Sequence, residues 1–119
     1  MITIYGIKNC DTCRKALKWL NTEGIEHTFH DFRRDGLDKK TVTNWIEKLG
    51  IEPLLNRRGT TWRNLSAKEQ NETNTSGITN LLIEKPTLIK RPVFDLSSCI
   101  LVGFKEEIQN TLKSYPMPD

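Results

Sequence analysis

The sequence lacks several features that would place it outside ordinary globular proteins. It has no apolar run approaching the ~18 residues of a membrane span. Its net charge is only +3, and no dense basic stripe accompanies this excess, so direct nucleic-acid binding is not indicated. With 36% hydrophobic and 28% charged residues, the chain is still apolar enough to form a core. The composition therefore predicts a soluble globular protein of one domain, and nothing in it demands more than a monomer.

Cysteine is scarce, and no leader segment is visible. Met1 leads directly into the strand-like run Ile2-Thr3-Ile4-Tyr5, without the charged and apolar regions of a signal peptide. We therefore expect a cytoplasmic protein. The three cysteines are an odd number in a chain too large to need disulfide stapling. In a reducing compartment this favours reactive or metal-binding thiols over structural disulfides.

The periodicity of apolar residues predicts a β-α-β unit, a helical middle and a β-β-α ending. Strands are expected over 2–5, 25–30, 93–96 and 99–102, and helices over 11–22, 38–49, 78–85 and 104–114. Residues 52–64 are expected to form an ordered loop, and Ser66 and Glu69 a capping box that opens a short polar helix. This order is the plan of an α/β, thioredoxin-like fold with a mixed four-stranded sheet. The polar helices near 38–85 are interpreted as an insertion with little core of its own, within a single domain over 1–119.

The pair Cys10-x-x-Cys13 lies where the first strand turns into the first helix, with Cys10 at the expected N-cap. Unpaired backbone amides and the helix dipole favour a thiolate there, and the thiolate is the nucleophile. Lys8 and Arg14 add positive charge, which Asp11 opposes. Cys10 can then attack a disulfide, and Cys13 can resolve the mixed disulfide. The alternative is that Cys13 is only a core residue on the apolar face of the helix.

Two other patterns involve cysteine or histidine. Cys10, Cys13, His27 and His30 nearly match a C2H2 zinc spacing. However, the two histidines lie in a strand-like run, where residues three apart point to opposite faces. We therefore expect no metal, and interpret both histidines as surface or edge residues of the second strand. Cys99 is interpreted as a packed residue of an apolar strand.

Arginines form two candidate anion sites. Arg91, before Pro92, is expected beside the redox cysteine, where it would stabilise the thiolate and bind a carboxylate such as that of glutathione. The alternative is a surface arginine in a salt bridge. Arg57 and Arg58 belong to a second basic cluster, of which one or two members could reach the cysteine; the alternative is a solvated loop without function.

Four segments together carry a family resemblance. They are Tyr5-Gly6-Ile7-Lys8-Asn9-Cys10-Asp11-Thr12, Asn56-Arg57-Arg58-Gly59-Thr60-Thr61-Trp62-Arg63, Ile89-Lys90-Arg91-Pro92-Val93 and Leu101-Val102-Gly103-Phe104. In combination they resemble the arsenate reductase/Spx (ArsC) family, and most of all its YffB branch. The resemblance implies a thioredoxin-like fold with a helical insertion and glutathione as co-substrate. It also implies a catalytic Cys10, an anion-binding Arg91 and a cis Pro92.

The resemblance leaves three functions open. The first is a glutathione-linked thiol oxidoreductase with Cys10, Cys13 and Arg91 as catalytic residues. Its candidate glutathione-binding residues are Lys8, Arg14, Arg57, Arg58, Arg91 and Pro92. The second is a redox-switched regulator that, like Spx, binds the C-terminal domain of the RNA polymerase α-subunit, as the presence of Cys13 suggests. The third is arsenate reduction, which the family links to three arginines; Gly103 stands where the third is expected.

Overall fold

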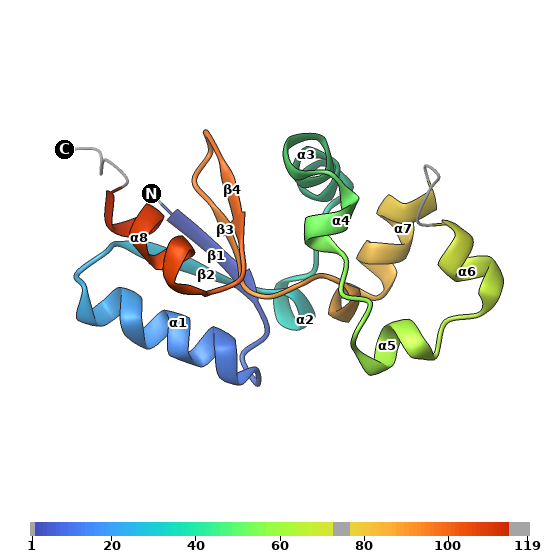
Figure 1. Cartoon of the computed structure of the whole chain (residues 1–119), viewed down its shortest axis with the longest axis horizontal. Coiled ribbons are helices and arrows are strands. Elements are labelled where there is room, and N and C mark those ends of the chain that lie inside the picture. Colours follow the sequence, from blue (N-terminus) through green and yellow to red (C-terminus); the bar gives the residue numbers. More distant parts are fainter. Residues whose placement is uncertain (1, 73–76, 115–119) are drawn as a thin grey trace. The chain divides into compact units, whose positions relative to one another are not determined.

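The computed structural model describes residues 2–72 and 77–114 (Figure 1). By their internal contacts the residues group into two compact units. Unit 1 consists of residues 1–34 and 91–119, and unit 2 of residues 35–90. Each unit is described separately below. No helix within the described residues is long and apolar enough to cross a membrane.

Unit 1 is built on a mixed four-stranded sheet with the strand order β2-β1-β3-β4. The strands are β1 (Ile2–Gly6), β2 (His27–Asp31), β3 (Val93–Asp95) and β4 (Ile100–Val102). β1 and β2 are parallel, while β1–β3 and β3–β4 are antiparallel. The register places Gly6 opposite Asp31, so β1 and β2 end together beside the turn that carries Cys10.

Two helices cover one face of this sheet, α1 (Asp11–Thr22) and α8 (Glu106–Ser114) (Figure 1). The core of unit 1 joins both helices to β1 and β3 through Ile2, Ile4, Ala16, Leu20, Phe94, Leu96 and Leu112. Each fully buried aliphatic side chain stabilises the fold by about 1.5–3 kcal/mol. This face therefore anchors α1 firmly, and with it the position of the α1 N-terminus. Sheet order and helix placement are those of the thioredoxin-like fold, as the sequence predicts.

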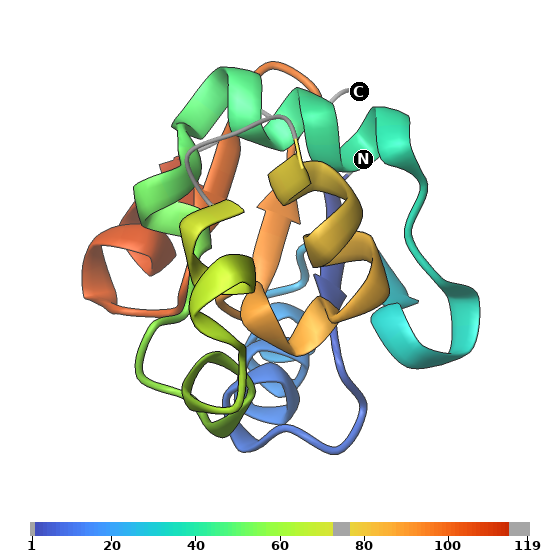
Figure 2. The same ribbon diagram turned by 90° about the vertical axis from the view of Figure 1, so that its right-hand side faces the viewer.

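Unit 2 is helical (Figure 2). Its elements are α3 (Lys39–Leu49), α4 (Ile51–Leu54), α5 (Thr60–Arg63), α6 (Ala67–Asn71), α7 (Gly77–Glu84) and the 3-10 helix η2 (Pro86–Leu88). The short helix α2 (Phe32–Asp35) leads from β2 into it. Backbone hydrogen bonds from Asn56 N to Leu88 O and from Lys90 N to Leu54 O, both 2.7 Å, join its first and last parts.

The helical middle differs from the sequence prediction in two respects. The expected loop over 52–64 contains α4 and α5, because single helical turns carry too little periodicity to be recognised. The helical middle near 38–85 also has more buried apolar side chains than the sequence predicts. Trp45, Leu54 and Leu82 are fully buried. The capping box is confirmed, since Glu69 N donates to Ser66 Oγ and Ser66 N to Glu69 Oε1. That the two units form one domain stays a prediction.

Candidate active site

The first turn of α1 places Cys10 at the helix N-cap, as the spacing predicts. Its backbone is extended, with φ −126° and ψ 123°, and its carbonyl accepts the first helical hydrogen bond from Arg14 N at 2.9 Å. The side chain is half-buried and not in a disulfide. Cys10 is therefore held between the loop of residues 7–9 and the open end of α1.

The surroundings of Cys10 favour its thiolate. Burial alone would raise the pKa of Cys10, but the backbone amide of Cys13, the Arg91 side chain and the Cys13 thiol together lower the pKa below the ordinary 9.0. The Cys10 thiol forms no capping hydrogen bond, so the Cys13 amide acts on it from nearby. Because thiolates are the reactive form, Cys10 has the surroundings of a nucleophile.

Cys13 has the opposite surroundings. It occupies the third position of α1, its side chain is fully buried, and it is not in a disulfide. Burial, and then its hydrogen bond and charge interaction with Cys10, raise the pKa of Cys13 to about 12, although the Ile7 backbone amide favours the charged form. Cys13 is thus both a packed core residue and a thiol that donates towards Cys10.

Gly6 makes room for the Cys13 sulfur. A Cβ added to Gly6 would lie well inside contact distance of Cys13 Sγ, with Cys13 Cβ at 3.5 Å and the Phe29 ring at 3.7 Å. Gly6 has no positive φ, so the glycine is required by space and not by backbone strain. This contact fixes how closely the first turn of α1 can approach the end of β1.

Arg91 interacts with Cys10 through its side chain. The Arg91–Pro92 peptide bond is cis, as expected, and Pro92 leads into β3. Arg91 is half-buried with its Nε atom buried, and its side chain favours the Cys10 thiolate by hydrogen bonding and by charge. Gly103, at φ 92°, donates its amide to Pro92 O at 2.8 Å. The hairpin β3–β4 therefore holds the backbone next to Arg91.

Asp31 is a site residue that the sequence reading missed. It is only 7% exposed and ends β2. Its Oδ2 accepts a hydrogen bond from Lys8 N at 3.1 Å, and its Oδ1 accepts from Arg33 N and Arg34 N at 2.8 and 3.2 Å. Burial opposes the charge, but these amides lower the pKa of Asp31 below its usual range. The available signal was an aspartate at a strand end, where it caps the next turn.

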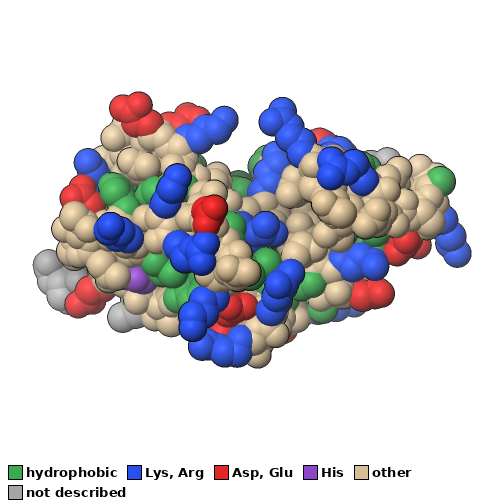
Figure 3. All heavy atoms as spheres, turned by 90° about the horizontal axis from the view of Figure 1, so that it is seen from below, with side chains coloured by type: hydrophobic (Ala, Val, Ile, Leu, Met, Phe, Trp, Pro, Cys, Tyr) green, Lys and Arg blue, Asp and Glu red, His purple; other side chains and the backbone are tan. Residues whose placement is uncertain are grey.

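Two basic residues near Cys10, Lys8 and Arg14, are exposed. The Arg14 guanidinium forms an ion pair with Asp11 and donates to Asn9 Oδ1 at 3.4 Å. Lys8 is exposed, and its backbone is the part bound to Asp31. On the face shown in Figure 3, basic side chains are interspersed with acidic ones. The roles of Lys8 and Arg14 in binding glutathione stay predictions.

The second arginine cluster lies in unit 2. Arg57 forms an ion pair with Glu52 and lies over the Trp62 ring, 5.4 Å from its centroid. The Glu52 carboxylate raises the pKa of Arg57 by hydrogen bonding and by charge, although burial opposes this. Arg58 N donates to Asn56 Oδ1 at 3.1 Å. That either arginine reaches the cysteine stays a prediction.

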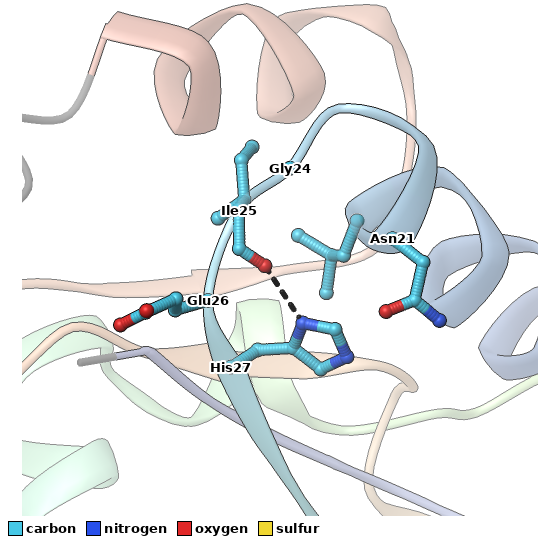
Figure 4. A pocket seen from close by; sticks show the side chains of 6 residues that line it. Asn21, Gly24, Ile25, Glu26 and His27 are labelled. Carbon is cyan, nitrogen blue, oxygen red and sulfur yellow. Dashed lines mark hydrogen bonds between the residues drawn. The ribbon is translucent and has the colours of Figure 1, made fainter.

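The histidines and Cys99 belong to other parts of unit 1 than the cysteine pair. His27 and His30 belong to β2, and no group of three His, Cys, Asp or Glu within 2–72 and 77–114 could hold a metal ion. His27 lines a pocket where α1 ends and β2 begins, with its Nδ1 2.9 Å from Ile25 O (Figure 4). This pocket is at the opposite end of α1 from Cys10. Cys99 packs against the core of unit 1, as expected.

The strand order, the cis proline and the C-x-x-C turn at α1 define a protein of the thioredoxin-like class. The model of the ArsC family matches residues 5–111. The chain belongs to the ArsC family.

Individual relatives agree with this membership. An uncharacterized protein of Haemophilus influenzae is 49% identical over 107 residues, which cover 90% of this chain and 94% of the relative. The global transcriptional regulator Spx of Streptococcus agalactiae is 28% identical, covering 90% and 79% of the two chains. The solved structure of the YFFB protein has a TM-score of 0.87 and 35% identity, covering 94% and 98%. The resemblance to the YffB branch is thereby confirmed.

Proposed function

We propose that the protein is a thiol oxidoreductase that uses Cys10 as its nucleophile, Cys13 as its resolving thiol and glutathione as its reductant. The observation that carries the proposal is that the surroundings of two neighbouring sulfurs shift their pKa values in opposite directions. The pKa of Cys10 is lowered by amide and guanidinium groups, whereas burial raises the pKa of Cys13 to about 12. A charged attacking sulfur beside a protonated partner suits thiol–disulfide exchange.

The proposed reaction reduces the substrate in two exchanges, and glutathione then restores the enzyme in two more. The Cys10 thiolate attacks one sulfur of a substrate disulfide, so a Cys10–substrate bond forms and the other substrate sulfur leaves as a thiolate. Cys13 then attacks the Cys10 sulfur, its proton passing to the departing thiolate or to solvent, and the second substrate sulfur leaves. Two glutathione thiols reduce the resulting Cys10–Cys13 disulfide and are oxidised to glutathione disulfide. Electrons and protons therefore balance.

The high pKa of Cys13 suits the order of these steps. Part of the shift comes from the hydrogen bond to Cys10 and from the charge on Cys10. Both contributions end when Cys10 becomes part of a mixed disulfide, because its sulfur is then neutral. The Ile7 amide, which favours a charged Cys13, remains. Cys13 would thus become a better nucleophile only after Cys10 has reacted.

A disulfide-reduction assay coupled to glutathione tests the proposal, using wild type, Cys10→Ser and Cys13→Ser. We expect Cys10→Ser to lose at least about a hundredfold in rate, because the nucleophile is absent. Cys13→Ser should accumulate a mixed disulfide on Cys10, detectable by mass spectrometry. If Cys10→Ser retains wild-type activity, the proposal is wrong.

A second candidate is an Spx-like regulator, favoured by the C-x-x-C pair together with the similarity to Spx over 90% of the chain. In this case the Cys10–Cys13 disulfide would control binding to the C-terminal domain of the RNA polymerase α-subunit. Pull-down with that domain, using reduced and oxidised protein, separates the two candidates. Binding that changes with oxidation favours the regulator, and no binding in either state removes it.

A further inference from the structure

Asp31 is a buried charge whose two carboxylate oxygens bind different parts of unit 1. Asp31 is 7% exposed, and among the described residues no other charged side chain is buried. It ends β2 opposite Gly6. Oδ1 accepts from the amides of Arg33 and Arg34, at the start of α2. Oδ2 accepts from the amide of Lys8, two residues before Cys10. One carboxylate thus connects the start of α2 to the turn of residues 7–9, which leads to Cys10.

The turn before Cys10 is held from two directions. The amide of Ile7 acts on the Cys13 sulfur, and the next amide, that of Lys8, donates to Asp31 at 3.1 Å. Two successive peptide groups are therefore oriented by different partners, one on α1 and one at the end of β2. The position of Cys10 depends on both, because the turn of residues 7–9 has no regular secondary structure of its own.

We propose that Asp31 is a positioning residue for Cys10, holding the Lys8 backbone so that the Cys10 sulfur stays close to the amides of the first turn of α1 and to Arg91. The inference rests on the proposed function, since it concerns the same sulfur. Asp31 is not a catalytic residue in this proposal. Its effect passes through the backbone of Lys8 and Asn9.

The charge of Asp31 and its positioning effect predict opposite changes at Cys10. A nearby negative charge disfavours a thiolate, so removal of the charge alone would lower the pKa of Cys10 or leave it unchanged. Loss of the Lys8 contact would instead let the sulfur move from the amides and the guanidinium that stabilise it, and the pKa of Cys10 would rise. The direction of the shift therefore distinguishes the two effects.

Asp31→Asn separates the hydrogen bonds of Oδ1 from the hydrogen bond of Oδ2. The amide oxygen can still accept from Arg33 N and Arg34 N, whereas the amide nitrogen is a donor and cannot accept from Lys8 N. We expect the rate of Cys10 alkylation by iodoacetamide at pH 7 to fall by about threefold to tenfold, as the loss of one such hydrogen bond implies. The pH profile should move to higher pH. An unchanged or lowered pKa of Cys10 overturns the proposal.

A matched control is Asp38→Asn, because Asp38 is likewise an aspartate that caps a helix, accepting from Thr41 N at 2.7 Å at the start of α3. The pH profile of Cys10 alkylation in Asp38→Asn should equal that of wild type. Asp31→Ser, which can cap α2 but is too short to hold Lys8, should shift the profile in the same direction as Asp31→Asn. Circular dichroism identifies variants that fold.

A measurement on the wild type keeps the test independent of variant folding. The NMR shift of the Lys8 amide should titrate together with the Asp31 carboxyl as the pH is lowered. A Lys8 amide that does not respond and exchanges freely with solvent overturns the proposal. If wild-type Cys10 reacts no faster than an unfolded thiol, the proposed function fails. If wild type is fast and Asp31→Asn equally fast, only the positioning role fails.

Discussion

The first turn of α1 carries two thiols whose surroundings shift their pKa values in opposite directions. At the N-cap, Cys10 is half-buried and its pKa lies below 9.0; at the third helical position, Cys13 is fully buried and its pKa is about 12. Burial is the largest influence on both thiols and raises the pKa of each. The difference arises from what offsets burial. At Cys10, the Cys13 amide, Arg91 and the Cys13 thiol together more than offset burial. At Cys13, the Ile7 amide does not, and the neighbouring Cys10 raises the pKa further.

Selective alkylation is the strongest way to break this comparison. Because the pKa of Cys10 lies below 9.0 and that of Cys13 is about 12, a much larger fraction of Cys10 is thiolate at pH 7, although the more basic thiolate of Cys13 is the stronger nucleophile. We expect Cys10 to react with iodoacetamide at least about fiftyfold faster than Cys13. Peptide mass spectrometry after timed quenching measures both rates.

The alkylation control is the same measurement in denaturant. There the two cysteines have lost their surroundings and should react at rates within about threefold of each other. Cys99, which is half-buried against the core, provides an internal reference in the folded protein. Equal rates at Cys10 and Cys13 in the folded state would contradict the assignment of nucleophile and resolving thiol.

The packing of Cys13 against Gly6 gives the next largest effect. Gly6→Ala should destabilise the protein by about 1–3 kcal/mol, because the added methyl meets Cys13 Sγ in a closely packed site. Cys13→Ala removes that sulfur, so the double variant should lose less than the sum of the two single losses. Urea unfolding of the four proteins gives the coupling energy. Additive losses would show that Gly6 and Cys13 are not in contact.

Variants of Arg91 test how far this side chain lowers the pKa of Cys10. Arg91→Met removes both the hydrogen bond and the charge that favour the Cys10 thiolate, and should slow its alkylation at pH 7 by about tenfold. Arg91→Lys keeps the charge on a shorter donor, and we expect a loss of about threefold. Cys13 should be affected little, because Arg91 is the smallest of the influences on it. The pH profiles of both alkylation rates are the measurement.

The part of this arrangement that follows from local patterns was predictable from the sequence. Cys10 at the N-cap follows from a strand, a short turn and a helical repeat in order, and Cys13 on the buried face follows from its spacing to Leu17 and Leu20. The strands β1 and β2 and the helices α1, α3 and α7 carry enough periodicity to be recognised. The cis Arg91–Pro92 bond was predictable only through the family resemblance.

What the sequence could not give depends on contacts between distant residues. Asp31 and Lys8 are 23 positions apart, and only the parallel pairing of β1 with β2 brings them together. The need for glycine at position 6 likewise arises from a sulfur on another element. α4 and α5, at four residues each, are too short to show a helical period, so the sequence predicts a loop there. The missed residues are thus those defined by tertiary packing.

The smallest expected effect distinguishes the two thiols by sign. The folded-state pKa of Cys13 lies above its unfolded value, so its stabilising effect is complete below pH 9 and is lost as pH rises towards 12. The pKa of Cys10 is lowered in the folded state, so its contribution is complete above pH 9 and is lost as pH falls. From pH 7 to 9.5, wild type should therefore lose stability relative to Cys13→Ala and gain stability relative to Cys10→Ala. Urea unfolding at both pH values measures these differences. If both differences have the same sign, the two cysteines do not have opposite surroundings.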